Sequence, residues 1–156
     1  MEQKILIIGG VAGGASSAAR LRRNSEEDQI IMFEKGPHVS FSNCSLPYHL
    51  SGIVEEADDL VLMSPELFKK QYNIDARVDS EVIEINREQK YVVVKNSISG
   101  ENYTETYDKL ILSPGASPIV PKIPGIEHVN VFTIRNVVDI DKLKKFLNQT
   151  STKDVA

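Results

Sequence analysis

The stretch KILIIGGVAGGASSA, residues 4 to 18, decides the fold. Its first part, Lys4 to Ile8, is a short aliphatic run that ends at Gly9, which is typical of a buried parallel strand entering a tight turn. Residues 15 to 24 are rich in helix formers, and the small residues at positions 15, 18 and 19 would let a helix lie close to a sheet. The stretch therefore predicts a strand, a glycine-rich turn and a helix, in that order.

An acidic residue at the end of the next predicted strand points to a nucleotide site. The turn GGVAGG (9–14) can offer backbone N–H groups and the helix dipole to a pyrophosphate, although Val11 replaces the middle glycine of G-x-G-x-x-G. Residues 29 to 34 read as a second buried strand, and its last residue, Glu34, lies about 20 residues after Gly14, where a carboxylate would bond ribose hydroxyls and disfavour a 2′-phosphate. A dinucleotide-binding β-α-β unit is predicted. The alternative is a glycine-rich turn and a surface glutamate in an ordinary α/β domain.

The remaining chain predicts a longer sheet, a meander and two more helices. The expected elements are a short helix after Cys44, a helix at 65–72, a strand at 74–78, β-rich runs at 82–85, 91–94 and 103–107, a strand at 109–112, an extended linker at 116–125, and a helix capped by Asn136 with Asp139 at its third position. The three short runs are expected to form an antiparallel meander. The predicted fold class is α/β, a three-layer Rossmann-like domain with a parallel sheet and a three-stranded antiparallel meander.

Composition narrows the class of protein. The 156 residues are 41% hydrophobic, which suits one globular domain or one domain plus the start of another. A net charge of -4 gives no overall field that would recruit nucleic acid or anionic lipid. The four aliphatics at 5 to 8 are too short for a secretory signal or a membrane helix, so a cytoplasmic protein without nucleic-acid or membrane partners is expected. No metal-ligand spacing is present.

Four ordered segments resemble the flavin-dependent pyridine nucleotide-disulfide oxidoreductases, within their single-cysteine branch, which contains the coenzyme A disulfide reductases. They are IIGGVAGGASSA (7–18), FEKG (33–36), SFSNCSLPY (40–48) and YDKLILSPGASP (107–118). The resemblance implies an FAD-binding domain at 1–117, a linker and connecting helix at 118–150, and the start of an NAD(P)H-binding domain at 151–156. It also implies the N-terminal part of a longer enzyme, expected to be inactive alone and homodimeric at full length.

Cys44 is the single cysteine and cannot form an intramolecular disulfide. In two-cysteine relatives a second cysteine stands five positions after the first, and here that position is His49. The resemblance therefore implies that Cys44 is catalytic and that its oxidised form is a mixed disulfide with a small thiol, or a sulfenic acid. A short helix after it, with Pro47 in the first turn, is expected to lower the thiol pKa through N–H groups and dipole. The alternative is a buried, inert thiol.

The resemblance also implies the binding residues. FAD is expected at Gly9, Ala12, Gly14, Glu34, Lys35, Asn43, Cys44, Val82, Ser113 and Gly115. Three residues, Ser16, Arg20 and Arg23, share one stripe of the first helix, so two guanidiniums could grip phosphates there. With Ser40 and Asn43, these residues are expected to bind coenzyme A. The alternative is a solvated arginine face paired with the neighbouring glutamates at positions 26 and 27.

The function implied is an FAD-dependent, NAD(P)H-linked thiol-disulfide oxidoreductase that reduces coenzyme A disulfide or persulfide through Cys44. Related single-cysteine peroxidases carry a histidine at the position that Ala12 occupies here. The alanine at this position argues against a peroxidase. Two alternatives stay open: an NADH oxidase that uses the same thiol, and a non-catalytic dinucleotide-binding module in which Cys44 is structural. The sequence leaves open the choice between NADH and NADPH and the identity of the sulfur substrate.

Overall fold

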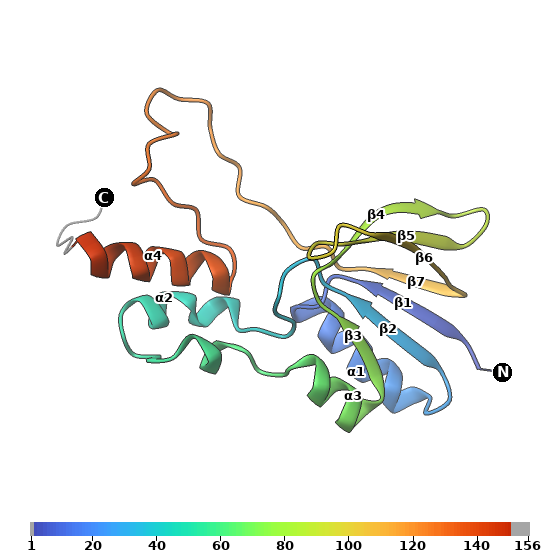
Figure 1. Ribbon diagram of the computed structural model, residues 1–156. Helices are drawn as coiled ribbons and strands as arrows, with labels where there is room; N and C mark the ends of the chain where they lie inside the picture. Colours follow the sequence, from blue (N-terminus) through green and yellow to red (C-terminus); the bar gives the residue numbers. More distant parts are fainter. Residues whose placement is uncertain (1, 151–156) are drawn as a thin grey trace. The chain divides into compact units, whose positions relative to one another are not determined.

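The structure, a computed structural model, describes residues 2–150 (Figure 1). The chain falls into two compact units. The first, which we call the sheet unit, comprises Met1–Phe41 and Val61–Gly115. The second, which we call the helical unit, comprises Ser42–Leu60 and the chain from Ala116 onward.

The sheet unit contains two sheets and two helices. Its elements are β1 (Lys4–Ile8), α1 (Ala12–Asn24), β2 (Gln29–Phe33), α3 (Pro65–Tyr72), β3 (Ile74–Arg77), β4 (Ser80–Asn86), β5 (Tyr91–Asn96), β6 (Asn102–Thr106) and β7 (Lys109–Leu112). The parallel sheet has the order β3-β2-β1-β7, with Ile7 of β1 paired to Met32 of β2 and Ile111 of β7. The antiparallel sheet has the order β4-β5-β6. Helices α1 and α3 cover one face of the parallel sheet and the antiparallel sheet covers the other (Figure 1), so the predicted three-layer α/β fold is confirmed.

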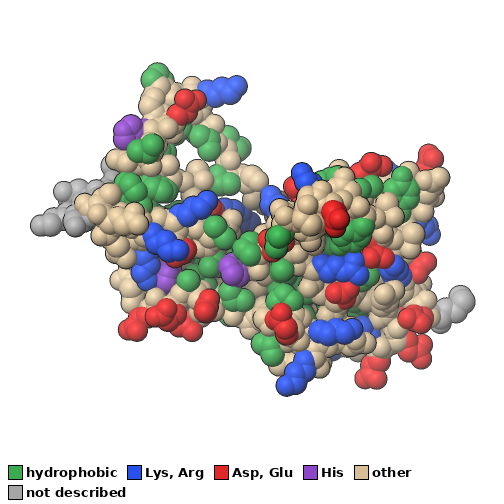
Figure 2. Space-filling model, in the orientation of Figure 1, with side chains coloured by type: hydrophobic (Ala, Val, Ile, Leu, Met, Phe, Trp, Pro, Cys, Tyr) green, Lys and Arg blue, Asp and Glu red, His purple; other side chains and the backbone are tan. Residues whose placement is uncertain are grey.

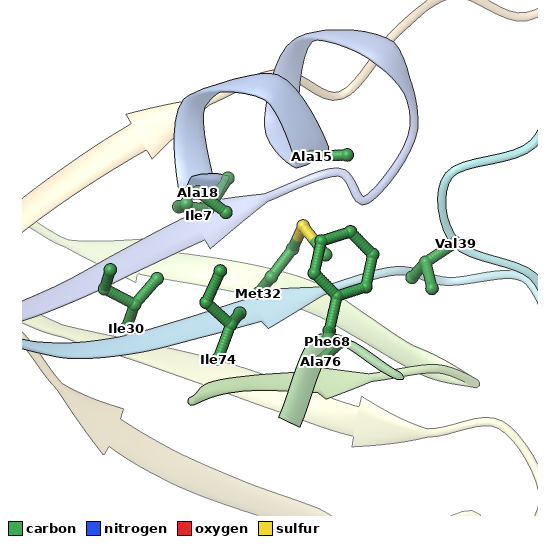
Figure 3. Packing of buried hydrophobic residues seen from close by; sticks show 9 residues of the cluster. All are labelled: Ile7, Ala15, Ala18, Ile30, Met32, Val39, Phe68, Ile74 and Ala76. Carbon is green, nitrogen blue, oxygen red and sulfur yellow. The ribbon is translucent and has the colours of Figure 1, made fainter. Parts of the chain in front are cut away.

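Both faces of the parallel sheet are apolar, because successive residues of a strand point to opposite faces and each face meets another layer. One core cluster packs the sheet against the helices and contains Ile7, Ala15, Ala18, Ile30, Met32, Val39, Phe68, Ile74 and Ala76 (Figure 3). The other packs the sheet against the meander and contains Leu6, Ile31, Phe33, Val92 and Val94. The apolar residues 5–8 of β1 and 30–33 of β2 therefore fill two cores at once.

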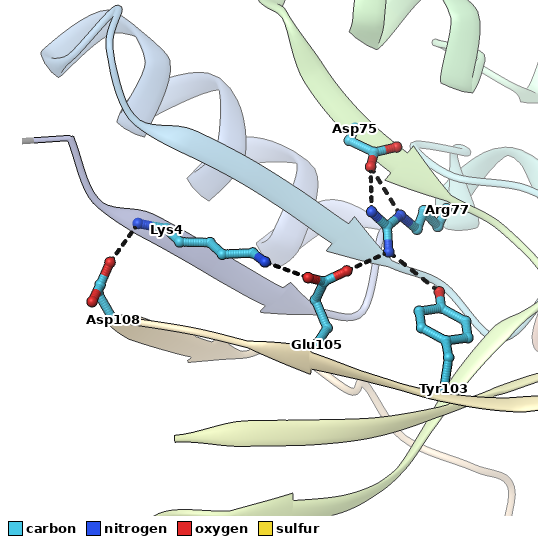
Figure 4. Close-up of polar contacts among 6 residues, drawn as sticks. All are labelled: Lys4, Asp75, Arg77, Tyr103, Glu105 and Asp108. Atoms are coloured by element: carbon cyan, nitrogen blue, oxygen red, sulfur yellow. Dashed lines mark hydrogen bonds and ion pairs between the residues drawn. The ribbon is translucent and has the colours of Figure 1, made fainter. Parts of the chain in front are cut away.

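A charged network joins the parallel sheet to the meander (Figure 4). The Arg77 guanidinium of β3 donates to Glu105 of β6 at 2.8 Å, and Glu105 also pairs with Lys4 of β1. Arg77 further contacts Asp75 at 2.7 Å and the Tyr103 hydroxyl at 3.5 Å. Burial alone would raise the pKa of Glu105, but the hydrogen bonds from Lys4 and Arg77 outweigh burial and lower it. The network thus links three strands through one carboxylate.

Arg22 holds the end of α1 in place. Its side chain is buried, and its N–H groups donate to the main-chain carbonyls of Ser25, Glu26, Asp28, Tyr72 and Asn73, at distances from 2.6 to 3.1 Å. These carbonyls belong to the loop before β2 and to the end of α3. A guanidinium has five N–H donors, so all of them are used. Arg22 therefore fastens two loop segments to the helix without a carboxylate partner.

The helical unit contains η1 (Asn43–Ser45), α2 (Leu46–Leu50), η2 (Ala57–Leu60) and α4 (Val137–Thr150). Helix α4 packs against α2 and η2 with Val137 and Ile140 buried. Asn136 and Asp139 cap α4 as predicted, since the Asn136 side chain accepts from the Asp139 N–H at 2.9 Å. Residues 116–125, predicted as an extended linker, form no helix or strand, and their role as a linker stays a prediction.

Some predicted boundaries were wrong by a few residues. Helix α1 begins at Ala12 rather than at residue 15, because the helix starts within the glycine-rich turn itself. Strands β2 and β3 end one residue earlier than predicted, at Phe33 and Arg77. The predicted start of a further domain at 151–156 lies outside the described residues, and the predicted division at residue 117 stays a prediction.

The surface carries both signs of charge. On the face drawn in Figure 2, Lys and Arg side chains lie interspersed with Asp and Glu side chains. Across residues 2–150, no helix has the length and apolar character needed to cross a membrane.

Replacing Arg22 by methionine should lower the free energy of unfolding by about 3 kcal/mol, because five main-chain carbonyls lose the donors of this part-buried network. Urea unfolding followed by circular dichroism would measure this loss. Exposed Arg23 on the same helix provides the control, and Arg23→Met should change stability by no more than about 0.5 kcal/mol. Equal stability of the two variants would contradict the assigned role of Arg22.

Replacing Glu105 by glutamine should cost about 2 kcal/mol at pH 7, because two cations lose their carboxylate. The pKa of Glu105 is lowered from its usual 4.5, so its contribution is complete above that value and is lost as pH falls through the folded-state pKa. The stability difference between the wild type and the variant should therefore shrink on acidification. Urea unfolding at pH 7 and at pH 3 would test this, with exposed Glu88→Gln as the control.

Candidate functional site

The glycine-rich turn brings β1, α1 and β7 into close contact. Gly9 has φ of 97°, and a Cβ there would lie 2.0 Å from the Ser113 carbonyl oxygen. A Cβ on Gly14 would lie 1.7 Å from the Gly9 carbonyl oxygen. Both positions therefore require glycine. The N-cap residue of α1, Val11, makes no side-chain cap bond, so the first N–H groups of the helix have no side-chain acceptor.

Glu34 closes the turn from the side of β2. One carboxylate oxygen accepts from the Gly10 N–H at 2.9 Å, and the other accepts from the Gly36 N–H at 3.0 Å. An ionised carboxylate has about four acceptor positions, so about two remain for a ligand hydroxyl. Glu34 can therefore order the turn and still accept a hydrogen bond from a ligand hydroxyl.

A pocket of about 160 Å³ opens beside this carboxylate, at the carboxyl ends of β1 and β2. It is lined by Ile8, Gly9, Phe33, Glu34, Lys35, Ser80, Glu81, Val82 and Pro114. Four of the residues predicted to bind the cofactor, Gly9, Glu34, Lys35 and Val82, thus share one pocket. Ligands of open α/β sheets bind at this end of the strands.

Three further predicted cofactor residues lie around the same turn. The side-chain oxygen of Ser113 lies 3.2 Å from the position a Cβ on Gly13 would take, so Ser113 packs on the start of α1. Ala12 is the first residue of α1 and is exposed. Gly115 adopts φ of 72°, a left-handed conformation that favours glycine.

The predicted phosphate-binding stripe of α1 is exposed. Ser16, Arg20 and Arg23 all face solvent. Among the described residues, neither arginine forms an ion pair, so the alternative pairing with the glutamates at positions 26 and 27 is not found. Ser40, the other substrate residue predicted in the sheet unit, has φ of 49° and donates its N–H to the Gly10 carbonyl at 2.8 Å.

Cys44 lies in the helical unit, in the middle of η1, and its side chain is exposed. The Ser42 hydroxyl lies 3.2 Å from the Cys44 sulfur and 2.8 Å from the Ser45 hydroxyl. The Ser42 hydroxyl is the largest influence on the Cys44 thiol and, with smaller contributions from Ser45 and the Cys44 N–H, it lowers the thiol pKa from the usual 9.0. The pKa falls as expected, but the main cause is a neighbouring hydroxyl rather than the helix that starts at Leu46.

Asn43 is held by Arg135, a residue that the sequence did not single out. When the Asn43 amide is oriented to satisfy both contacts, its oxygen accepts from the Arg135 guanidinium and its nitrogen donates to the Arg135 carbonyl, each at 3.2 Å. The predicted cofactor and substrate role of Asn43 must therefore use its remaining hydrogen-bonding capacity. The two residues lie 92 positions apart, so no local sequence pattern indicated that they would pair.

His49, at the position of the second cysteine in two-cysteine relatives, is 2% exposed. Its Nδ1 lies 2.8 Å from the Val54 carbonyl, and its Nε2 lies 3.5 Å from the Lys144 ammonium. A lysine ammonium can only donate, so Nε2 accepts and Nδ1 carries the proton. His49 thus joins α2 to α4, and its imidazole is occupied at both nitrogens.

The sequence matches a known protein family over nearly its whole length. The family described as pyridine nucleotide-disulphide oxidoreductase matches residues 3–155. The chain belongs to the pyridine nucleotide-disulphide oxidoreductase family. The resemblance predicted from four sequence segments is thereby confirmed.

Individual relatives agree with this assignment. The chain is 39% identical over 151 residues to the coenzyme A disulfide reductase of Staphylococcus haemolyticus (strain JCSC1435), covering 97% of this chain and 34% of the relative. The crystal structure of reduced Bacillus anthracis CoADR-RHD superposes with a TM-score of 0.94 and 52% identity, covering 97% of this chain and 27% of that one. The NAD-dependent persulfide reductase from A. fulgidus gives a TM-score of 0.89 and 32% identity, with coverages of 94% and 28%. The chain thus spans about a third of the length of the curated relatives it matches.

Replacing Ser42 by alanine should raise the pKa of the Cys44 thiol toward 9.0, because the thiolate loses its main hydrogen-bond donor. The rate of alkylation by iodoacetamide at pH 7 should fall about threefold, since only the thiolate reacts. The rate profile from pH 6 to pH 10 would locate the pKa directly. Ser51→Ala, which removes an exposed hydroxyl bonded to the Tyr48 carbonyl, should leave the profile unchanged.

Proposed function

We propose that this chain is the flavin-binding and thiol-bearing part of an NAD(P)H-linked reductase of coenzyme A disulfide or persulfide. The observation that carries the proposal is the exposed Cys44 thiol with its lowered pKa, in a chain of this family. A structural cysteine would be buried, and its pKa would be raised by apolar surroundings. These properties disfavour the alternative of a purely structural cysteine.

The residues around the glycine-rich turn fit FAD. The uncapped N–H groups of α1 would hold the pyrophosphate, and Glu34 would accept from ribose hydroxyls in the adjoining pocket. The absence of side chains at Gly9 and Gly14 lets the turn approach a ligand closely. When bound, FAD would supply the electrons that return the oxidised cysteine to its thiol.

The exposed arginines of α1 support a phosphorylated substrate. Arg20 and Arg23 carry guanidiniums without ion-pair partners among the described residues, and arginine suits bidentate phosphate binding. Ser16 adds a hydroxyl to the same stripe. Coenzyme A, which carries several phosphate groups, fits this chemistry, and the names of the relatives point the same way.

The sulfur step uses Cys44 alone. Its thiolate attacks one sulfur of coenzyme A disulfide, forms a cysteine–coenzyme A disulfide, and releases the other coenzyme A as a thiolate. Two electrons and one proton then release the second coenzyme A thiol and restore the cysteine thiolate. The Ser42 hydroxyl stabilises this thiolate before attack and after release. With His49 buried at the resolving position, the mixed disulfide has no second cysteine to resolve it.

Incubation with coenzyme A disulfide should add one coenzyme A to Cys44, detected as a reducible mass increase in the intact protein. The double variant Arg20→Met/Arg23→Met should slow this reaction about tenfold, because each exposed phosphate contact contributes about 0.7 kcal/mol and about 1.4 kcal/mol corresponds to a factor of ten. Its rate with hydroxyethyl disulfide, which has no phosphate, should not change. Cys44→Ser should form no adduct with either reagent.

Other outcomes would select other functions. A thiol that ignores disulfides under native conditions would favour the non-catalytic module. In a protein of the relatives' length, NADH consumption with oxygen that exceeds the rate with coenzyme A disulfide would favour the oxidase, and a faster rate with coenzyme A persulfide would favour a persulfide reductase. We expect no NAD(P)H turnover by residues 1–156 alone, because they span only a third of the relatives.

A further inference from the structure

The side-chain amide of Asn43, the residue before Cys44, contacts both the guanidinium and the main-chain carbonyl of Arg135. With the Asn43 amide in the orientation that satisfies both contacts, its oxygen accepts from the Arg135 guanidinium and its nitrogen donates to the Arg135 carbonyl, each at 3.2 Å. We propose that Arg135 is a positioning residue that acts through Asn43 to fix the turn presenting the Cys44 sulfur. The proposal rests on the proposed function of Cys44, since it assigns a role in preparing that thiol.

Arg135 is itself fixed by the start of α4. The Asp139 carboxylate accepts from the N–H of Arg135 at 3.0 Å and from that of Asn136 at 3.3 Å, while Asn136 caps the helix in return. The Arg135 Nε donates to the Ala116 carbonyl at 2.9 Å. Both the main chain and the side chain of Arg135 are therefore anchored independently of Asn43. A residue held in this way can act as a fixed reference for the turn.

Asn43 is connected to the Cys44 sulfur through the turn that contains both residues. Asn43 is the first residue of η1, and its carbonyl accepts from the Leu46 N–H, while the Ser45 N–H donates to the Ser42 carbonyl at 3.1 Å. The Ser42 hydroxyl lies 3.2 Å from the Cys44 sulfur across this same turn. A change in the backbone angles of Asn43 would move Cys44 relative to Ser42. Holding Asn43 therefore holds the hydrogen bond that prepares the thiol.

A positioning role and an electrostatic role of Arg135 predict different results when lysine replaces it. The Ser42 hydroxyl is the largest influence on the Cys44 thiol, and the charge of Arg135 is not among the causes of its lowered pKa. A lysine at position 135 would keep the charge but lose the planar fork that meets Asn43 and Ala116 together. If Arg135 acts by positioning, lysine should not replace it.

The test measures the pH profile of iodoacetamide alkylation, which reports on Cys44 alone because the chain has one cysteine. Arg135→Met and Arg135→Lys should each raise the pKa of the thiol and slow alkylation at pH 7 by about threefold to tenfold. Asn43→Ala should do the same. The double variant Arg135→Met/Asn43→Ala should be no slower than Asn43→Ala, because residues that act through one another are not additive. Arg87→Met, which removes an exposed arginine of the sheet unit, should match the wild type.

Three results would overturn the proposal: a wild-type profile for Arg135→Met, full rescue by Arg135→Lys, or additive effects in the double variant. Urea unfolding of each variant separates positioning from loss of fold. If Arg135→Met is unstable, Asn43→Ala decides the question, since it leaves the Arg135 side chain and its bond to the Ala116 carbonyl in place. Failure of the proposed function has a different signature, namely a wild-type thiol that alkylates readily but forms no mixed disulfide with coenzyme A disulfide.

Discussion

The carbonyl oxygen of Gly9 leaves no space for a side chain on Gly14, and this steric constraint sets the geometry of the sheet unit. Because α1 begins within the turn, its first residues lie against the end of β1 and its axis is directed along the sheet. Ala15 and Ala18 can then pack directly on the strands, and Arg22 reaches the carbonyls near the start of β2 and β3. A larger residue in the turn would displace the helix start, and with it the pocket beside Glu34.

The candidate sites of the two units consist of different kinds of groups. In the sheet unit the proposed binding surface consists largely of main-chain N–H groups, glycines without side chains and one carboxylate. In the helical unit the thiol depends on side chains that contact other side chains, with Ser42 on the sulfur and Arg135 on Asn43. A main-chain site tolerates many surrounding sequences as long as its glycines remain. A site made of paired side chains is lost when either partner changes.

This difference explains how much the sequence could predict. The strands, the meander and the glycine-rich turn follow from local patterns, since buried strands are apolar at every position and turns require particular residues. Glu34 was identifiable because its distance from the turn is fixed by the length of one helix and one strand. Arg22 and Arg135 were missed, because nothing near them in sequence marks one as buried and the other as bonded to position 43. Ser42 was missed although it stands only two residues from the cysteine, because the sequence alone does not show whether its hydroxyl points toward the sulfur.

The occupied state of His49 bears on the proposed single-thiol mechanism. A resolving cysteine must be free to approach the first sulfur, but His49 is buried and bonded at both ring nitrogens. The residue at position 49 therefore joins α2 to α4. Because of this contact, the helix that follows Cys44 is held in place. Under the proposed function, a rigid turn would suit exchange with an external disulfide, because the attacking sulfur would not have to alternate between an internal partner and the substrate. The contacts of His49 and the proposed chemistry of Cys44 thus depend on the same local packing.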